Sequence, residues 1–463
     1  MSKAFETWAI PAGILPSLAS VEEGAVRHPV LRPDQARALI SALRDAGSEV
    51  FPGRGAAARA RSLGRAGSRF LDTGDPLRRE AEALLPESAD LSPAMARAVI
   101  DGMARDWTAE RLLGLLAAEL PHPDALDRFV PGHAGVRVRA FAPALSLHMG
   151  AGTVPGVAAT SMLRALLVGS AAVVKPGRGD VVLPVLLARA LAEEEPALAR
   201  AVAVLYWGGG GDSAAEDVLV RGADLVVVYG GDDTVGALRE RLLVTTRLVA
   251  YHHRVSVALV GRTALTQETM PAAAEATARA VAMFDQRGCV SPHAVFVEEG
   301  GEAGPREFAR MLALELDALS YSLPATASPA RVASAVQQLR WTAELRAAAG
   351  EDVELHASPD TSWTVLFDPL PAFEVSCLGR SVRVHAVADA GELPALLAPL
   401  GKHLQTVGVA GLADRLDRVA TELGRVGVMR VCALAEVAFP PAWWHHDGEG
   451  PLRALLRWVD LEG

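Results

Sequence analysis

The sequence predicts an α/β fold in which a helical N-terminal region precedes two successive α/β units. Apolar residues recur at helical spacing over the first 130 residues. Short β-branched runs then alternate with helical segments from residue 136 to residue 251, and the alternation resumes after residue 255. Such alternation is typical of parallel sheets with right-handed crossovers. A chain of 463 residues is long enough for about two or three domains of this kind.

The N-terminal region is expected to form helices where apolar and alanine positions fall on one helical face. These stretches are residues 34–46, 56–71 and 95–120. The arginines between residues 59 and 69 are expected to form a solvated helix face, because small residues separate the charges.

The first sheet is expected to be parallel and doubly wound. A strand predicted at residues 136–141 precedes it, and its own strands are predicted at residues 145–149, 171–175, 201–207, 225–229 and 248–251. The intervening helices are expected to start near Val154, Asp180, Asp212 and Thr234. Rossmann-type sheets bind nucleotides at the carboxyl ends of their strands, so this unit is predicted to be a cofactor domain.

The second α/β unit is predicted from a further set of apolar runs and helical segments. Its strands are expected at residues 255–260, 294–297, 364–367, 382–387 and 406–409, and its helices at residues 272–283, 307–316, 330–348 and 413–423. A stretch with Gly and Pro at residues 260–271 is the candidate junction. The predicted domains are therefore residues 1–260, residues 261–430, and a C-terminal segment of residues 431–463 that packs back.

Composition and charge narrow the class of protein. The chain is 50% hydrophobic and 22% charged, which is typical of a globular protein, and its formal net charge is −10. That charge argues against a nucleic-acid partner, because phosphate contacts need clustered Lys and Arg. No run approaches the roughly 18 apolar residues of a membrane-spanning helix. Residues 1–18 carry charges and prolines instead of a signal-peptide core, so a cytoplasmic protein is expected.

The cysteines are odd in number and widely spaced: Cys289, Cys377 and Cys432. Without a C-x-x-C pair, neither a zinc site nor a disulfide framework is expected, and no metal site is predicted. Cys289 stands apart because Gly288 precedes it and Ser-Pro follows, which indicates a turn. A cation such as Arg287 beside it would raise its thiolate fraction. The alternative, a small buried hydrophobe, fits the other two cysteines better.

Two glycine turns precede predicted helices. Gly150, Gly152 and Gly156 nearly match the dinucleotide fingerprint G-x-G-x-x-G, although a plain tight turn is equally consistent with them. The second turn, residues 229–236, could present a helix N-terminus to a pyrophosphate. In that turn Asp232 and Asp233 could equally be N-caps without a ligand.

Polar residues also gather at two other places. Lys175 and Arg178 follow the predicted strand 171–175, where two cations would favour a 2′-phosphate or would simply face solvent. Residues 443–448, Trp-Trp-His-His-Asp-Gly, contain His446 and Asp447. They could belong to a Cys-His-Asp arrangement or form a hydrogen-bonded turn that packs the tail.

Together these motifs resemble the aldehyde dehydrogenase superfamily, and more closely its acyl-CoA reductase branch, the LuxC-like fatty-acyl reductases of bacterial luminescence. The resemblance covers about residues 141–462. It rests on five segments in order along the chain, residues 286–292, 403–408, 427–430, 446–448 and 457–460. It implies an aldehyde dehydrogenase-like fold with a Rossmann-type cofactor domain and an α/β catalytic domain that carries Cys289.

The resemblance also implies a reaction. Cys289 would attack an acyl thioester, from acyl-CoA or from an acyl-carrier or acyl-protein donor, and a nicotinamide cofactor would reduce the acyl-enzyme to an aldehyde. Thr153 replaces the asparagine that family members usually carry as an oxyanion donor. The amides of Cys289 and Val290 are the other expected donors.

The cofactor implied by the resemblance is NADPH, with NADH less favoured. A cation at Arg178 stands where NAD-preferring relatives often carry a glutamate. The residues expected to hold the cofactor are Lys175, Arg178, Gly209, Gly230, Gly231 and Thr234.

The resemblance leaves rival interpretations in place. Tyr251 takes the position of the glutamate that activates water in oxidative aldehyde dehydrogenases, which favours a reductase. His253 is a candidate substitute acid or base, or a structural residue. An oxidative aldehyde dehydrogenase and a non-catalytic subunit that captures an acyl group remain the alternatives. A homo-oligomer is expected, with residues 136–141 and 428–431 as candidate contacts, and an acyl-activating synthetase is a candidate partner.

Overall fold

The computed structural model describes residues 4–15, 17–208 and 214–463. The chain divides into two compact units, one made of Met1–His252 with Pro441–Gly463 and the other of His253–Pro440. The first boundary therefore precedes the predicted strand 255–260 instead of following it. This strand, β12 (Val255–Val260), pairs with β13 and β17 of the second unit. The stretch 260–271 is not a junction, because it leads directly into α11 of the same unit.

The first unit is built on a doubly wound sheet. Among its described residues, six strands follow the order β11-β10-β7-β8-β9-β2, and all neighbours are parallel except β2 and β9. Their bounds are β2 Trp8–Ala9, β7 Leu145–Met149, β8 Ala171–Lys175, β9 Val202–Leu205, β10 Leu225–Tyr229 and β11 Arg247–Tyr251. The chain reverses its winding between β7 and β10, which is where ligands of such sheets bind.

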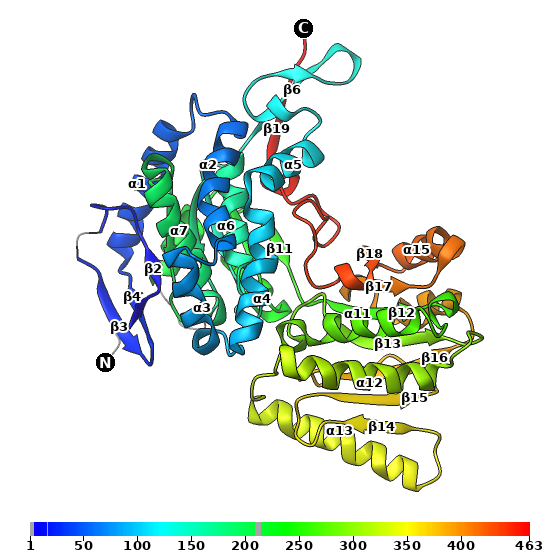
Figure 1. Ribbon diagram of the computed structural model, residues 1–463. Helices are drawn as coiled ribbons and strands as arrows, with labels where there is room; N and C mark the ends of the chain where they lie inside the picture. The colour runs from blue at the N-terminus through cyan, green and yellow to red at the C-terminus, as the bar shows by residue number, and fades with distance from the viewer. Residues whose placement is uncertain (1–3, 16, 209–213) are drawn as a thin grey trace. The chain divides into compact units, whose positions relative to one another are not determined.

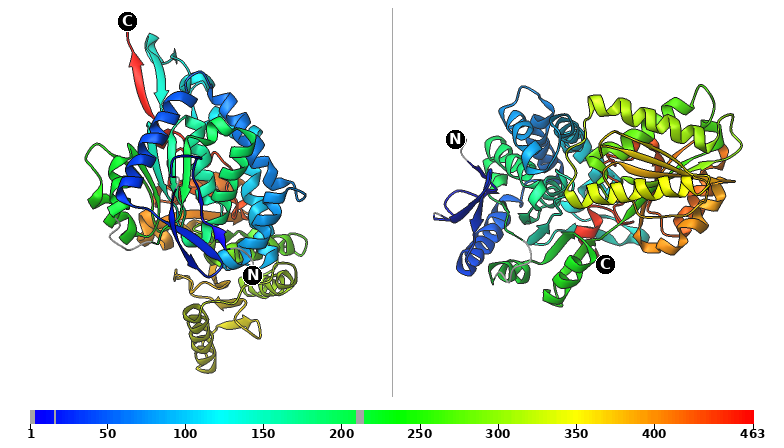
Figure 2. Two further views of the ribbon diagram at one scale, coloured as in Figure 1. Left: turned by 90° about the vertical axis from the view of Figure 1, so that its left-hand side faces the viewer. Right: turned by 90° about the horizontal axis from the view of Figure 1, so that it is seen from below.

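Helices cover both faces of this sheet (Figures 1 and 2). On one face α6 (Val157–Val168) and α7 (Val182–Glu194) connect the strands, and α2 (Ala56–Ser68) packs over them. On the other face α1 (Pro33–Val50) packs against α9 (Ala214–Gly222). The α/β prediction for this unit is confirmed.

The N-terminal region is less purely helical than predicted. It contains the strand β1 (Phe5–Glu6) and a hairpin of β3 (Ala19–Glu23) and β4 (Val26–Val30). The helix expected at 95–120 is split in two by the Thr108 side chain, which caps the second half. Its halves and one unpredicted helix are α4 Pro93–Ala104, α5 Ala109–Glu119 and α3 Pro76–Ser88.

Arg59 corrects the expectation of a fully solvated arginine face. Its side chain is buried, and its Nε donates to the Leu167 carbonyl at 2.9 Å. Burial lowers the pKa of Arg59 to about 10. This arginine therefore ties α2 to the end of α6, whereas Arg65 is an exposed residue of the same helix.

A small sheet brings distant parts of the first unit together. The C-terminal strand β19 (Arg457–Leu461) pairs antiparallel with β6 (Arg137–Phe141), and β6 also pairs with β5 (Val130–Pro131) (Figure 2). The buried Glu119 carboxylate accepts hydrogen bonds from the Leu452 and Arg453 amides at 3.1 and 3.2 Å. The chain end is thus fixed to α5.

The second unit is a mixed sheet with helices packed on it. In the described part of this unit, seven strands follow the order β14-β15-β16-β13-β12-β17-β18, and β14 alone is antiparallel to its neighbour. The strands other than β12 are β13 Pro292–Glu298, β14 Glu354–Ala357, β15 Thr364–Asp368, β16 Ser381–Val387, β17 Leu404–Ala410 and β18 Arg430–Ala433. All five strands predicted here are confirmed, and β18 overlaps the tail segment 428–431 that was expected as a candidate contact; β14 was not predicted.

The core of this unit lies between its sheet and the helices packed on it. Helices α11 and α12 lie side by side over it (Figure 1). Residues of α14 and α15 pack against Val257, Leu259 and Phe296 from β12 and β13. The helices are α11 Met270–Ala282, α12 Pro305–Ser322, α13 Ala330–Ala348, α14 Leu393–Leu397 and α15 Leu416–Arg425. Because β12, β13, β16 and β17 pair in parallel, their amino ends lie at one edge of the sheet.

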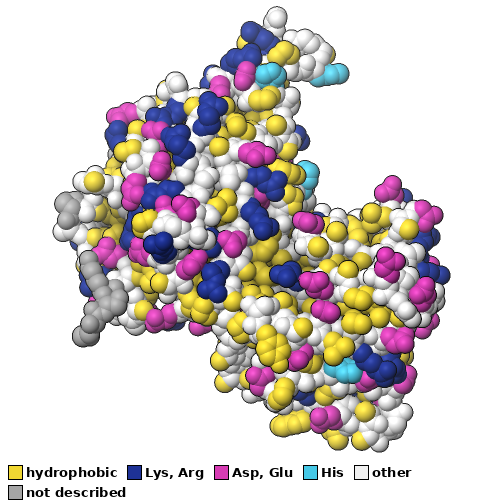
Figure 3. Space-filling model, in the orientation of Figure 1, with side chains coloured by type: hydrophobic (Ala, Val, Ile, Leu, Met, Phe, Trp, Pro, Cys, Tyr) yellow, Lys and Arg dark blue, Asp and Glu magenta, His cyan; other side chains and the backbone are white. Residues whose placement is uncertain are grey.

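The surface mixes charges of both signs. Lys and Arg side chains are interspersed with Asp and Glu on the face drawn in Figure 3. Among the described helices, none is long and apolar enough to cross a membrane.

Candidate active site

Cys289 lies in a turn at the amino edge of the second sheet, between the end of α11 and β13. Its side chain is half-buried, and the next residue, Val290, is buried. The Ser256 hydroxyl donates to the Cys289 carbonyl at 2.7 Å and accepts from the Thr406 amide at 3.1 Å. These bonds attach the turn to β12 and β17. Cys289 thus lies in a turn, as predicted, and remains partly accessible.

The backbone before Cys289 is left-handed at three successive residues. Phe284, Asp285 and Gln286 have φ values of 56°, 50° and 64°. Non-glycine residues in this region cost about 1–3 kcal/mol each and persist only where the surroundings enforce them. Here the buried Gln286 amide donates to the Pro292 and Ser381 carbonyls at 2.8 and 3.0 Å, and its oxygen accepts from the Ser381 amide at 2.9 Å.

A buried ion pair also holds this turn. Arg380 is 1% exposed, and its Nε and Nη2 donate to Asp285 Oδ1 at 2.9 and 2.7 Å. Its Nη1 donates to the Leu323 carbonyl at 2.8 Å, and the Thr326 hydroxyl donates to Asp285 Oδ2 at 2.6 Å. Arg380 and Asp285 are 95 positions apart, so spacing along the sequence gives no signal for this pair.

Two arginines neighbour the Cys289 turn. Arg287 donates from its Nε to the Phe284 carbonyl at 3.1 Å. Arg430 begins β18, in register with Thr406, and donates to the carbonyls of Glu436 and Val437 at 2.6 and 3.1 Å. Burial lowers the pKa of Arg430, and the charges of Cys432, Glu436 and Cys289 oppose that lowering. In the sequence, Arg430 is recognisable only as the last residue of the segment 427–430.

Histidines lie at the same edge of the second sheet. His293 is buried, and its Nδ1 accepts from the Ser376 amide at 3.1 Å. Burial, followed by the charge of His253, lowers the pKa of His293 to about 4. His253 is exposed, and its carbonyl lies 3.3 Å from His403 Nδ1. The acid–base role of His253 stays a prediction.

In the first unit, both predicted glycine turns flank the point where the sheet reverses. Gly150 follows β7, and Gly230 follows β10. The Gly150 turn packs backbone to backbone against the turn after β8 that contains Gly177. A Cβ on Gly177 would lie 2.2 Å from the Gly152 amide nitrogen. The buried Asp180 carboxylate accepts from the amides of Gly156 and Ala158 at 2.6 and 2.8 Å.

That carboxylate closes the N-terminus of α6. Two amides that a pyrophosphate would use there, those of Gly156 and Ala158, already have this carboxylate as their acceptor. The Gly150 turn therefore supports the packing of two loops and is not a phosphate cradle of the fingerprint type. Thr153, within this turn, is exposed.

The predicted cations Lys175 and Arg178 lie at the end of β8. Lys175 is half-buried, with its Nζ 5.9 Å from the centre of the Trp207 ring. Burial lowers the pKa of Lys175, and Glu216 opposes this effect. The Arg178 side chain is 76% exposed and pairs with Glu23 of β3 at 3.0 Å. An exposed cation beside a half-buried one fits the phosphate and ribose of a dinucleotide.

The second glycine turn opens α10 (Asp232–Arg241), whose N-cap is Gly231. Asp232 and Asp233 are in the first helical turn, so the alternative that they cap the helix is wrong. Among the described residues, no side chain caps this helix. Thr234 lies beside Gly230, where an added Cβ would be 3.2 Å from the threonine side chain. Gly209 lies outside the described residues.

Aromatic rings stack at the carboxyl ends of β10 and β11. The ring centres of Tyr229 and Tyr251 are 4.6 Å apart, those of Tyr251 and His446 are 4.2 Å apart, and those of Trp444 and His446 are 4.5 Å apart. Burial, followed by Tyr229, raises the pKa of Tyr251, so its phenol is neutral.

The C-terminal motif is a hydrogen-bonded turn. The Gly448 amide donates to the His445 carbonyl at 3.1 Å, and the Glu449 amide donates to the His446 carbonyl at 3.1 Å. This agrees with the turn interpretation of residues 443–448. His446 Nε2 lies 3.7 Å from Asp447 Oδ1. The structure places His446 against Tyr251, and its role in a Cys-His-Asp arrangement stays untested.

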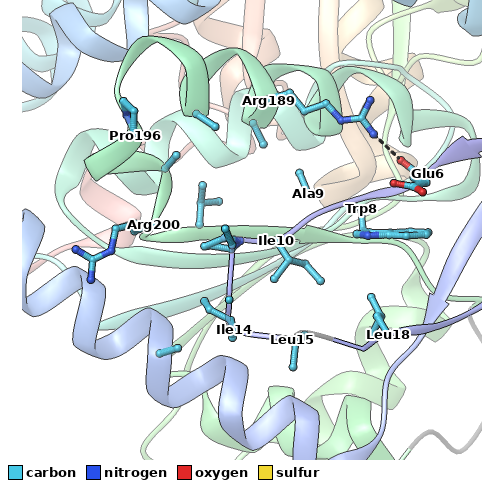
Figure 4. Close-up of a pocket in the computed structure, with 18 of the residues that line it drawn as sticks. Glu6, Trp8, Ala9, Ile10, Ile14, Leu15, Leu18, Arg189, Pro196 and Arg200 are labelled. Atoms are coloured by element: carbon cyan, nitrogen blue, oxygen red, sulfur yellow. Dashed lines mark hydrogen bonds between the residues drawn. The ribbon is translucent and has the colours of Figure 1, made fainter.

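A cavity of about 1380 Å³ also opens in the first unit (Figure 4). The lining is largely apolar and includes Trp8, Ile10 and Leu15. Arg189, on the helix above it, donates to the Glu6 carbonyl at 3.3 Å. None of the described residues that line this cavity belongs to the predicted catalytic or cofactor-binding set.

Comparison with known proteins identifies what this arrangement is similar to. The model of a family described as acyl-CoA reductase (LuxC) matches residues 63–458. A long-chain acyl-protein thioester reductase of Photobacterium phosphoreum is 24% identical over 378 residues, covering 80% of this chain and 73% of that protein. The protein of the same name from Aliivibrio fischeri is 24% identical over 373 residues, covering 78% of this chain and 74% of the relative.

Solved structures agree on the fold. Aldehyde dehydrogenase 21 of Physcomitrella patens superimposes with a TM-score of 0.74 at 13% identity, covering 100% of this chain and 98% of that one. The NADP-dependent glyceraldehyde-3-phosphate dehydrogenase of Bacillus halodurans C-125, complexed with NADP, gives a TM-score of 0.70 at 17% identity and covers 100% and 99%. The predicted aldehyde dehydrogenase-like fold is confirmed.

Proposed function

Because the chain belongs to the acyl-CoA reductase (LuxC) family of oxidoreductases, we propose that it reduces an acyl thioester to the corresponding aldehyde through an acyl-enzyme on Cys289. The observation that carries the proposal is the setting of Cys289. It is half-buried in a turn whose strained backbone is enforced by the buried side chains of Asp285 and Gln286. A nucleophile needs such fixed geometry to attack efficiently.

In the proposed first step the Cys289 sulfur bonds to the acyl carbon, and the bond to the donor sulfur breaks. The donor thiolate leaves and takes up a proton. The amides of Cys289 and Val290 are proposed to stabilise the intermediate oxyanion. The hydroxyl of Thr153 has the same proposed role, by resemblance to the family asparagine.

The proposed reductant is NADPH, with NADH as the weaker alternative. Lys175 would hold the adenosine ribose, Arg178 the 2′-phosphate, and the turn with Gly230, Gly231 and Thr234 the pyrophosphate. Gly209 belongs to the same proposed set. The exposed charge of Arg178 supports the preference, since guanidinium groups bind phosphate through charge-assisted hydrogen bonds. When bound, this cofactor supplies the hydride that turns the acyl-enzyme into a thiohemiacetal, which releases the aldehyde and the thiolate.

The absence of a base at position 251 favours reduction over hydrolysis. A neutral phenol with a raised pKa, stacked between two rings, is a poor base for activating water near neutral pH. An acyl-enzyme with no activated water nearby would survive until hydride reaches it. This argument disfavours the alternative of an oxidative aldehyde dehydrogenase.

The names of the relatives support a proposal for the acyl donor and the partners. Those relatives are named long-chain acyl-protein thioester reductases, so a long-chain acyl-protein or acyl-CoA is the proposed donor. An acyl-activating synthetase would then supply the acyl group in the cytoplasm. A homo-oligomer is also proposed, with the partly exposed Trp458 and Leu461 of β19 beside β6 as a candidate contact.

The test is consumption of NADPH and formation of aldehyde with a panel of acyl-CoAs of increasing length. Wild type is compared with Cys289→Ala, and Cys432→Ala is the matched control because burial raises the pKa of that thiol. We expect turnover in wild type and the control and none in Cys289→Ala. Turnover by Cys289→Ala would contradict the mechanism. Acylation of wild type without turnover would instead favour the acyl-capturing subunit.

A further inference from the structure

Two left-handed turns face each other at the amino edge of the second sheet. The first contains Phe284, Asp285 and Gln286 before β13; the second contains Leu378, Gly379 and Arg380 before β16. The φ values in the second turn are 70°, 63° and 55°. Strands β13 and β16 are neighbours, with Ala294 in register with Arg383. The turns are therefore held side by side by the sheet that follows them.

The turns are joined by contacts between buried groups. The Arg380 guanidinium, 1% exposed, makes two hydrogen bonds to Asp285 Oδ1 at 2.7 and 2.9 Å. One position further along each turn, the Gln286 side chain binds both the amide and the carbonyl of Ser381 at 2.9 and 3.0 Å.

We propose that this clasp, the Asp285–Arg380 pair that joins the two left-handed turns, positions Cys289 for acylation. The inference rests on the proposed function of Cys289. Asp285 and Arg380 do not touch the reacting atoms in this account; they act through the turn and are positioning residues.

The left-handed backbone of residues 284–286 is strained. A left-handed Phe284 or Asp285 would return to an ordinary conformation unless its surroundings forbid it. Only Arg287 and Gly288 separate Cys289 from this turn, and the Cys289 carbonyl is fixed by the Ser256 hydroxyl. Relaxation at Asp285 would therefore have to be absorbed between Gln286 and Cys289.

The clasp also resists partial replacement. The second carboxylate oxygen of Asp285 accepts from the Thr326 hydroxyl at 2.6 Å, and the remaining Arg380 nitrogen reaches the Leu323 carbonyl at 2.8 Å. Lysine keeps the charge of Arg380 but has no planar fork for these positions. Removal of one partner leaves the other charge buried without compensation.

The experiment compares Arg380→Lys and Asp285→Asn with Arg340→Lys. Arg340 is a matched control because it is 7% exposed and, unlike Arg380, donates to the carbonyls of Ser358 and Trp363, at 3.1 and 2.9 Å, and not to Asp285. Thr326→Val removes the hydroxyl that supports Asp285 without removing a charge, for the case that Asp285→Asn does not fold. The readouts are kcat and KM, and the rate of iodoacetamide alkylation of Cys289 by peptide mass spectrometry, with Cys432 as the internal reference.

We expect Asp285→Asn to lower kcat and Cys289 alkylation by about 10- to 100-fold, because small displacements of a nucleophile cost rates of this order. KM should stay within about two-fold, and Arg380→Lys and Thr326→Val should lie between wild type and Asp285→Asn. Arg340→Lys should lower thermal stability without slowing the alkylation of Cys289.

The proposal is wrong if the clasp variants lose thermal stability while the folded protein alkylates Cys289 at the wild-type rate. It is equally wrong if Arg340→Lys slows Cys289 as much as Arg380→Lys does. Alkylation needs neither acyl donor nor cofactor. Failure of the proposed reductase activity in wild type would therefore leave the result for the clasp decisive on its own.

Discussion

His293 has to be neutral for its position in the second sheet. Its Nδ1 accepts a hydrogen bond from the Ser376 amide at 3.1 Å, and the side chain is 6% exposed. A proton on Nδ1 would face the donor N–H of Ser376 and would place a charge in an apolar setting. Burial and the charge of His253 accordingly lower the pKa of His293 to about 4.

This lowered pKa predicts a loss of stability in mild acid. Between the usual pKa of 6.5 and the folded value of about 4, the unfolded chain binds a proton at His293 and the folded chain does not. Stability therefore falls as the pH drops through this window, by about 3 kcal/mol at most. His293→Gln keeps a hydrogen-bond acceptor and removes the titration, so its urea midpoint should depend less on pH.

The comparison is made by urea unfolding at about pH 7, above that window, and at about pH 4.5, near its lower end. Parallel pH dependence of wild type and His293→Gln would show that His293 does not carry the effect. His133, which lies in a short surface turn and is exposed, provides the control variant His133→Gln.

At the residue scale the sequence predicts the local setting of Cys289 but not what enforces it. Gly288 before the cysteine and Ser-Pro after it are local signals of a turn, and the structure confirms the turn. Arg380 reaches the turn from the loop before β16, and Ser256 reaches it from β12. Spacing along a single sequence gives no signal for contacts of this kind.

Among elements, the buried parallel strands are the most predictable. Strands β8, β10 and β12 have the predicted bounds, because strands buried on both faces are continuous apolar runs. The hairpin strand β3 was missed because all five of its residues are exposed and two are glutamates. The helix at 95–120 was predicted as one because a capped break has little effect on helical spacing.

The missed hairpin bears on the cofactor prediction. Glu23 of β3 pairs with Arg178 after β8 at 3.0 Å, and both side chains are more than half exposed. Such an exposed pair contributes little to stability. A 2′-phosphate could therefore compete with Glu23 for the guanidinium at small cost.

Arg178→Glu is expected to weaken NADPH binding about 10- to 100-fold more than NADH binding, because a charge-assisted contact becomes a repulsion. Binding is measured by titration of the intrinsic tryptophan fluorescence. Glu23→Gln is the matched control, since it removes the partner and keeps the cation, and it should strengthen NADPH binding. An unchanged ratio of the two affinities in Arg178→Glu would remove Arg178 from the cofactor site.

At the scale of the whole molecule, the pairing of strands decides where the domain boundaries lie. Strand β12 belongs to the second unit because it pairs with β13 and β17, although nothing in its composition separates it from the strands before it. The chain returns to the first unit at Pro441, after β18 has paired with β17. The predicted boundaries at residues 260 and 430 used composition and could not include these pairings.

The return of the chain to the first unit depends on Glu119. Its carboxylate, 2% exposed, accepts from the amides of Leu452 and Arg453. Glu119→Ala leaves these two donors without an acceptor and should lower the free energy of unfolding by about 1–3 kcal/mol. Glu119→Gln should cost less. Urea midpoints are compared with those of Glu110→Gln, an exposed position on the same helix; an equal effect at both positions would contradict this role.

In the proposed reaction the acyl group passes through Cys289. The intact mass of the protein after incubation with a long-chain acyl-CoA, first without NADPH and then with it, tests this step. We expect one added acyl group on Cys289, stable in the absence of NADPH and released as aldehyde when NADPH is added. Aldehyde formation by Cys289→Ala, or release of the acyl group as free acid before NADPH is added, would contradict it.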